Sequence, residues 1–153
     1  MSQLQSSPLF DISLALHPPH DLGVTPLGTR RIVPVSGGMF TGERLKGVVL
    51  PNAGADWILM RRDGSVQLDV RLTLKTDDDA LIFMTYRGIR HSSPEVAQQL
   101  ARGEKVDPAA YYFRTCPVFE TSYEKYEWLN NIICVAVGER LASEVKYKVF
   151  EIL

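Results

Sequence analysis

Charged and aromatic side chains recur where the sequence predicts half-buried strands. Arg71 lies between Val70 and Leu72 in an alternating run, while Arg114 and Glu120 share parity on another predicted strand. If these side chains face a barrel interior, an arginine among aromatic rings could hold a carboxylate or an enolate, and a carboxylate could act as a base. The candidate catalytic residues are Glu120, Asp56, Arg71 and Arg114, and the candidate ligand-binding residues are Trp57, Asp69, Tyr86, Trp128 and Asn130.

The opposite orientation of these strands would leave the same charges in water. Alternation alone favours this outward orientation, because polar faces usually meet solvent and the valine and leucine face would then form a plain core. A buried arginine is costly unless it is paired. An inward Arg71 or Arg114 is therefore expected to have an acidic partner, with Asp56, Asp69 and Glu120 as the candidates.

Other kinds of site find little support in the residue pattern. His17 and His20 flank two prolines, but a metal site needs three or four convergent ligands, so surface histidines are the simpler interpretation. Cys116 has no histidine near it in sequence, and the chain has no G-x-S-x-G nucleophile elbow. Gly37-Gly38 lacks the spacing of a phosphate-binding loop. We expect neither a metal nor an organic cofactor.

Composition and charge limit the classes of partner that the protein is expected to bind. The 153 residues carry 17 Lys plus Arg and 18 Asp plus Glu, so no strong field attracts nucleic acid or an anionic membrane. No apolar run has the roughly 20 residues of a membrane helix. The first residues lack the pattern of a signal peptide, and the two cysteines have no metal or redox spacing. These features predict a cytoplasmic protein.

The elements that must position the candidate residues are predominantly strands. Short runs rich in β-branched and aromatic residues are separated by turn residues at fairly even spacing, as in an all-β barrel or sandwich. Ser93-Pro94-Glu95 is a helix start, and Gly103 a stop, so we expect one short helix over 94–102. Because closure removes exposed strand edges, we predict one mainly β domain, 1–153, forming an antiparallel barrel of about eight or nine strands. The predicted strands cover 9–16, 29–35, 39–50, 56–62, 66–75, 80–88, 111–122, 129–137 and 145–153.

Several short motifs, in order and spacing, resemble one family. They are Gly28-Thr29-Arg30-Arg31-Ile32-Val33-Pro34-Val35, Ser36-Gly37-Gly38-Met39-Phe40, Leu45-Lys46-Gly47-Val48-Val49-Leu50-Pro51, Gly54-Ala55-Asp56-Trp57, Arg62-Asp63-Gly64, Leu68-Asp69-Val70-Arg71, Tyr112-Phe113-Arg114-Thr115, Phe119-Glu120-Thr121 and Tyr126-Glu127-Trp128-Leu129-Asn130. The chain resembles the DUF3237 family, also called UPF0311, from about residue 9 to 153. The resemblance implies a small oligomeric barrel of lipocalin-like or calycin-like appearance. It names no reaction, but its motifs contain the charged positions above, which a merely solvated face would not require.

The sequence supports one leading hypothesis about function and two alternatives. The leading hypothesis is a barrel that binds a small hydrophobic or aromatic oxygenated metabolite and acts on it by cofactor-free proton transfer, as an isomerase, cyclase or lyase. The alternatives are a non-catalytic carrier using the same cavity, and a structural oligomer with a filled barrel. The apolar run Ile132–Val137 does not alternate, so both faces of its strand should be buried, and we expect a homo-oligomer, most simply a dimer.

Overall fold

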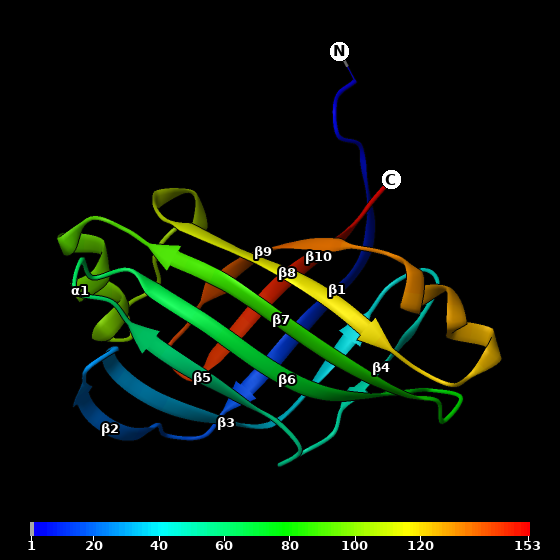
Figure 1. Ribbon diagram of the computed structural model, residues 1–153, viewed down its shortest axis with the longest axis horizontal. Helices are drawn as coiled ribbons and strands as arrows, with labels where there is room; N and C mark the ends of the chain where they lie inside the picture. Colours follow the sequence, from blue (N-terminus) through cyan, green and yellow to red (C-terminus); the bar gives the residue numbers. More distant parts are fainter. Residues whose placement is uncertain (1) are drawn as a thin grey trace.

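The computed structural model describes residues 2–153, and it is an antiparallel β-barrel with short helices at its two ends (Figure 1). The helices are α1 (Pro94–Ala101) and two 3-10 helices, η1 (Pro108–Ala110) and η2 (Glu124–Asn131). The strands are β1 (Ser6–Leu16), β2 (His20–Thr25), β3 (Gly28–Thr41), β4 (Lys46–Val49), β5 (Ala55–Met60), β6 (Val66–Thr76), β7 (Leu81–His91), β8 (Tyr112–Glu120), β9 (Cys134–Arg140) and β10 (Glu144–Ile152).

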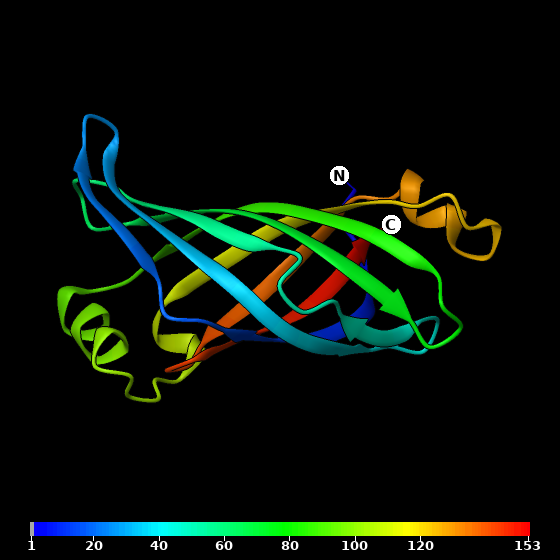
Figure 2. The same cartoon turned by 90° about the horizontal axis from the view of Figure 1, so that it is seen from below.

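The sheet closes on itself because β1 pairs with both β10 and β3. The strands β4 and β5 occupy one position in the barrel, since β3 and β6 flank both of them: β5 pairs with one half of each, and β4 with the other half. Counting that pair as one gives eight positions around the barrel. β2 pairs with β3 and extends it as a hairpin beyond the barrel wall (Figure 2). The predicted antiparallel barrel is confirmed.

The alternation of β6 decides which face is inside. Val66, Leu68, Val70, Leu72 and Leu74 are all buried, and the polar residues between them are more accessible. The interior is therefore the apolar face, as the alternation alone favoured. Each of these side chains is removed from water by the barrel wall, which provides most of the driving force for closure.

One end of the barrel is filled by large side chains and covered by η2. Phe10 packs between Phe40 and Phe119, with ring centroids 5.3 and 5.9 Å apart. Leu129 of η2 is fully buried beside them in the same core. This end has no room for a ligand among its aromatic rings.

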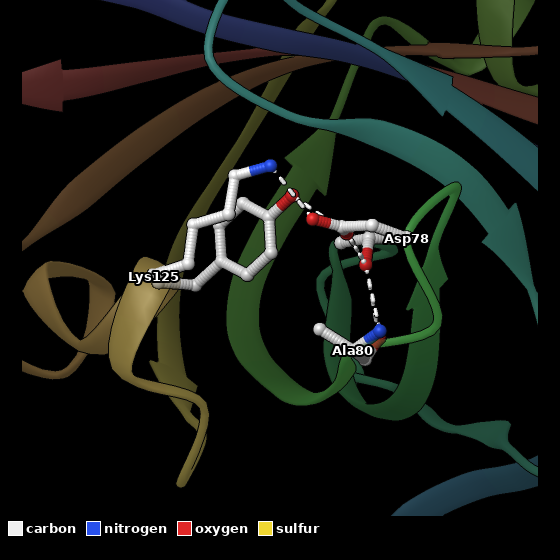
Figure 3. A network of polar contacts seen from close by, with 5 residues as sticks. Asp78, Ala80 and Lys125 are labelled. Atoms are coloured by element: carbon white, nitrogen blue, oxygen red, sulfur yellow. Dashed lines mark hydrogen bonds and ion pairs between the residues drawn. The ribbon is translucent and has the colours of Figure 1, made fainter.

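A polar network holds η2 to the β6–β7 turn (Figure 3). The Asp78 carboxylate accepts hydrogen bonds from Lys125 Nζ at 2.7 Å, Tyr126 OH at 2.8 Å and Thr76 Oγ1 at 2.5 Å. Thr76 Oγ1 in turn accepts from the Ala80 amide at 2.9 Å. These bonds hold the pKa of Asp78 well below its usual range, so the carboxylate stays ionised. The network is structural: it fixes the covered end.

The chain departs from the predicted elements in three places. The predicted strand over 129–137 is wrong: η2 ends at Asn131, and β9 runs from Cys134 to Arg140. The apolar residues of this segment do not form one strand. Leu129 belongs to the helix η2, and Ile133 is 65% exposed in the connection between η2 and β9. Predicted strands 29–35 and 39–50 are instead one strand, β3, which passes through Gly37-Gly38, followed by the short β4. The sequence analysis also missed β2, whereas helix α1 is confirmed, with the Ser93 hydroxyl accepting from the Val96 amide.

No helix among residues 2–153 is both long enough and apolar enough to span a bilayer.

Candidate functional site

Helix α1 lies at one end of the barrel (Figure 2). A cavity of about 480 Å³ opens at that end, with Ala97, Leu100 and Ala101 of α1 among its lining residues. Its mouth is formed by the β1–β2 connection, the β5–β6 hairpin, the β7–α1 connection, the β9–β10 turn and α1 itself. Its volume lies within the range of typical small-molecule pockets, roughly 300–1,000 Å³. The cavity therefore has room for a ligand of metabolite size.

Valines make up much of the apolar lining of the cavity. Its walls include Val33, Val35, Val66, Val70 and Val145, together with the larger side chains of Tyr86, Phe113 and Tyr147. An eight-stranded barrel is just wide enough for its side chains or for one small ligand. Because valine side chains are small, they leave part of the barrel interior at this end unfilled.

Asp56 is the one Asp or Glu among the described residues that line this cavity. It lies on β5, paired with Val33 on one side and Val70 on the other. The paired residues of β5 and β6 are interrupted beyond Asp56 and resume at Leu59, and in the gap Asp56 Oδ1 accepts the Asp69 amide at 3.1 Å. The side chain thus replaces a backbone acceptor and is fixed in direction.

Burial raises the pKa of Asp56 from 3.8 to about 7. Desolvation of the carboxylate is the largest cause, and the Asp69 amide and the Arg90 guanidinium oppose it. The carboxyl group is therefore about half protonated at neutral pH. A group in this condition can either give or take a proton.

Two tyrosines form the wall near Asp56. The rings of Tyr86 and Tyr147 meet edge to face with centroids 5.2 Å apart, and Tyr147 meets Phe113 in the same way at 5.3 Å. Burial is the main reason that the pKa values of both phenols lie above their usual range. Both hydroxyls remain protonated at neutral pH and are available as hydrogen-bond donors.

Three arginines also line the cavity: Arg31 of β3, Arg90 of β7 and Arg140 of β9. Burial, followed by repulsion from Arg140, lowers the pKa of Arg90 to about 10. Burial is likewise the first cause of the lowered pKa of Arg140, followed by repulsion from Arg31. All three guanidinium groups remain charged at neutral pH.

Of the nine predicted site residues, the structure places Asp56 and Tyr86 in this cavity. Trp57, Asp69 and Arg71 lie on the outer wall of the barrel, around a shallow depression near β2. There the Arg71 guanidinium lies 5.2 Å from the centre of the Trp57 ring. The inward orientation considered for Arg71 is wrong, because it alternates with Val70 and Leu72, which fill the interior.

Arg114 and Glu120 also face outward on β8, where Phe113 and Phe119 are the buried neighbours. Arg114 donates to the Phe113 carbonyl oxygen at 3.0 Å and lies over Tyr112, and Glu120 is exposed. The prediction that the two side chains share one face of the strand is correct, but that face is directed to solvent. Among residues 2–153, neither Arg71 nor Arg114 has a carboxylate within 4.0 Å, and Glu120 has no cationic group within that distance, contrary to the expected pairing.

The last two predicted residues lie at the η2 end. The Trp128 ring is covered by the Arg44 guanidinium, 3.5 Å from its centre. Asn130 bridges backbone groups: its Oδ1 accepts from the Thr121 amide at 2.8 Å, and its Nδ2 donates to the Thr121 and Glu127 carbonyl oxygens. Trp128 therefore contacts the β3–β4 connection, and Asn130 ties η2 to the residue that follows β8; neither residue lines the cavity.

The sequence analysis missed Arg31, Arg90, Arg140 and Tyr147. The alternation of the sequence contains a signal for two of them, Arg90 and Tyr147. Arg90 shares parity with Tyr86 on β7, and Tyr147 shares parity with the buried Val145 and Val149 on β10. Once the apolar face is known to be inside, the same alternation places both side chains inside.

Sequence comparison gives the relationship of this chain to known proteins. The model of the family described as "Protein of unknown function (DUF3237)" matches residues 4–152. The chain belongs to the DUF3237 family. A UPF0311 protein of Bradyrhizobium diazoefficiens is 42% identical over 131 residues, covering 86% of this chain and 85% of the relative. The resemblance drawn from the motifs is thereby confirmed.

Solved structures share the barrel of this DUF3237 protein. The crystal structure of a conserved protein of unknown function from Rhodopseudomonas palustris superimposes with a TM-score of 0.96 at 35% identity and covers both chains completely. A more distant structure, an enzyme from Penicillium herquei, has a TM-score of 0.73 at 21% identity and covers 100% of this chain and 97% of its own. At that identity the likeness extends to the fold alone.

Proposed function

We propose that this DUF3237 barrel binds a small, partly apolar, oxygenated organic molecule in the cavity and moves a proton on it without a cofactor. The observation that carries the proposal is Asp56: a carboxyl group with a pKa of about 7, fixed by a backbone amide, inside a cavity of ligand size. A strongly raised carboxyl pKa inside a pocket is typical of catalytic acids and bases. The reaction class is isomerisation, cyclisation or addition–elimination.

The proton transfer uses groups already in place. In its ionised form Asp56 takes a proton from a carbon next to a carbonyl group of the ligand, and the electron pair moves to the carbonyl oxygen as an enolate. Arg90 and the phenols of Tyr86 and Tyr147 are the donors able to stabilise that oxygen. Asp56 then returns the proton to another carbon or to a leaving group, which restores the enzyme.

The carrier alternative uses the same cavity and differs in one respect, the fate of the ligand's protons. The proposal is therefore tested by deuterium incorporation. The purified protein is incubated in D₂O with a panel of small cyclic and aromatic ketones, and ligand mass is followed. The wild-type protein is expected to exchange an α-proton of at least one compound.

The Asp56→Asn variant should lose about 100-fold or more of that rate, since general acid–base groups contribute roughly 10²–10⁴-fold. Arg71→Gln on the outer wall is the matched control and should retain it. Compounds that bind to the wild-type protein without exchange, or exchange equally with Asp56→Asn, would favour the carrier.

A further inference from the structure

We propose that Arg31, Arg90 and Arg140 form an anion-binding site at the cavity mouth, and that the ligand is an organic acid held there by its carboxylate. This inference rests on the proposed function, because it takes the cavity as the place where a small molecule binds. It adds the charge of the ligand and the direction in which the ligand enters.

The three guanidinium groups come from strands far apart in sequence and face one space. They are close enough that Arg140 opposes the positive charge of Arg90, and Arg31 opposes that of Arg140. Bringing like charges together in a partly buried site costs free energy that folding must supply. A bound anion would remove that cost.

No protein carboxylate neutralises the two inner arginines. Within residues 2–153, neither Arg90 nor Arg140 has a carboxylate within 4.0 Å, whereas Arg31 forms an ion pair with Asp21, 3.4 Å from Nε to Oδ2. Arg31 Nε is also buried without a hydrogen-bond acceptor. Asp56 is the nearby acid, and its pKa of about 7 leaves it half neutral at the pH where the arginines are fully charged.

The surroundings of Arg90 fix its direction. Its guanidinium lies 5.6 Å from the centre of the Phe113 ring, and its charge favours the ionised form of Asp56. Guanidinium groups bind carboxylates through paired parallel hydrogen bonds, which sets the orientation of the bound acid. A carboxylate at the arginines would leave the apolar body of the ligand among the valines, with its reactive carbon near Asp56.

The other titratable groups that line the cavity are consistent with a site for an anion. His17 and His91 are at the mouth, and His17 Nε2 contacts Asn52 Oδ1 at 2.9 Å. The lining therefore combines three cations, two imidazoles and a single carboxyl group. The whole chain has a net charge of -1, so the positive character belongs to the cavity and not to the molecule.

The test compares 2-naphthoate with 2-naphthamide, which have the same ring and nearly the same shape but differ in charge. Binding is measured by calorimetry at fixed ionic strength. The wild-type protein is expected to prefer 2-naphthoate by about tenfold or more, since charge-assisted hydrogen bonds stabilise by more than neutral ones. Arg90→Met and Arg31→Met should each remove most of that preference and leave 2-naphthamide affinity within about twofold. Arg114→Met on the outer wall is the control and should retain the preference.

Unfolding temperature separates a binding role from a structural one. Without ligand, Arg90→Met should unfold at the same or a higher temperature, because it removes repulsion from Arg140. If Arg90→Met does not fold, Arg31→Met and Arg140→Met decide the question. Equal affinity for the two compounds, or a preference that survives these variants, would overturn the anion site while leaving Asp56 chemistry intact. Failure of either compound to bind would also overturn it, and the deuterium assay would then judge the proton transfer separately.

Discussion

Replacing Asp56 with Asn should make the protein more stable at pH 8 and leave its stability at pH 4 nearly unchanged. The carboxyl group has a pKa of about 7 in the folded protein, against an ordinary value of 3.8. The folded state therefore holds this proton more tightly than the unfolded state. Stability from the neutral form is complete below about pH 4 and is lost as the pH rises toward 7.

The size of the effect follows from the shift. About three pH units, at about 1.4 kcal/mol per unit, correspond to about 4 kcal/mol of unfolding free energy lost between pH 4 and pH 7. Asn stays neutral and can still accept the Asp69 amide through Oδ1, so the variant avoids this loss. For a chain of this length the gain at pH 8 amounts to roughly 10 °C in unfolding temperature.

The assay is urea unfolding of both proteins from pH 4 to pH 8. The quantity of interest is the difference in unfolding free energy between variant and wild type, since it removes the contribution of every other titrating group. The pH 4 value serves as the baseline for any change in packing that the amide introduces. A difference that is constant with pH, or a variant less stable than wild type at pH 8, would refute the assignment.

Three further predictions concern the barrel itself. Gly88→Ala should destabilise the fold by about 1–3 kcal/mol in urea unfolding, because its Cβ would overlap the Arg114 carbonyl oxygen across the β7–β8 pair; unchanged stability would contradict the close approach. Asp78→Asn should increase amide hydrogen exchange in η2 at pH 7, and in the wild type the same loosening should appear as the pH falls below about 4, since the ionised form makes the network. Equal exchange in the two proteins at pH 7 would show that η2 is held by packing alone. Light scattering should give about twice 17.2 kDa, because Ile133 is 65% exposed and Val135 and Val137 on the outer face of β9 are only half-buried; a mass of 17.2 kDa at micromolar concentration would contradict the dimer.

The barrel could be predicted from the sequence because its signals are local. The alternation in β6, the Asp63-Gly64 hairpin and the Ser93 cap each depend on neighbouring residues, and all three appear in the structure. The η2 segment could not be predicted in this way. Leu129 is apolar in either a strand or a helix, and what selects the helix is the distant contact of Lys125 and Tyr126 with Asp78.

Only part of the candidate site could be predicted, because the remaining residues also depend on contacts between distant parts of the chain. Alternation identifies which residues share a face but not which face is inside, and the charged positions were examined before the apolar face was assigned. Asp56 and Tyr86 belong to the set of charged and aromatic residues predicted at half-buried strand positions, and they are the two members of that set that line the cavity. The arginine cluster depends on how β3, β7 and β9 meet around the barrel, and no spacing along the chain expresses that arrangement.

The most direct test of the central claim is the titration of the Asp56 carboxyl group itself. Carbon NMR of protein labelled at aspartate carboxyl carbons, with Asp56→Asn used to assign the signal, gives its pKa in the folded protein. The structure predicts a midpoint of about 7, rising further in Arg90→Met because the guanidinium stabilises the carboxylate. A midpoint near the ordinary value of 3.8 would contradict the account, since burial in the cavity would then leave the carboxyl pKa unperturbed and the observation that carries the proposal would be lost.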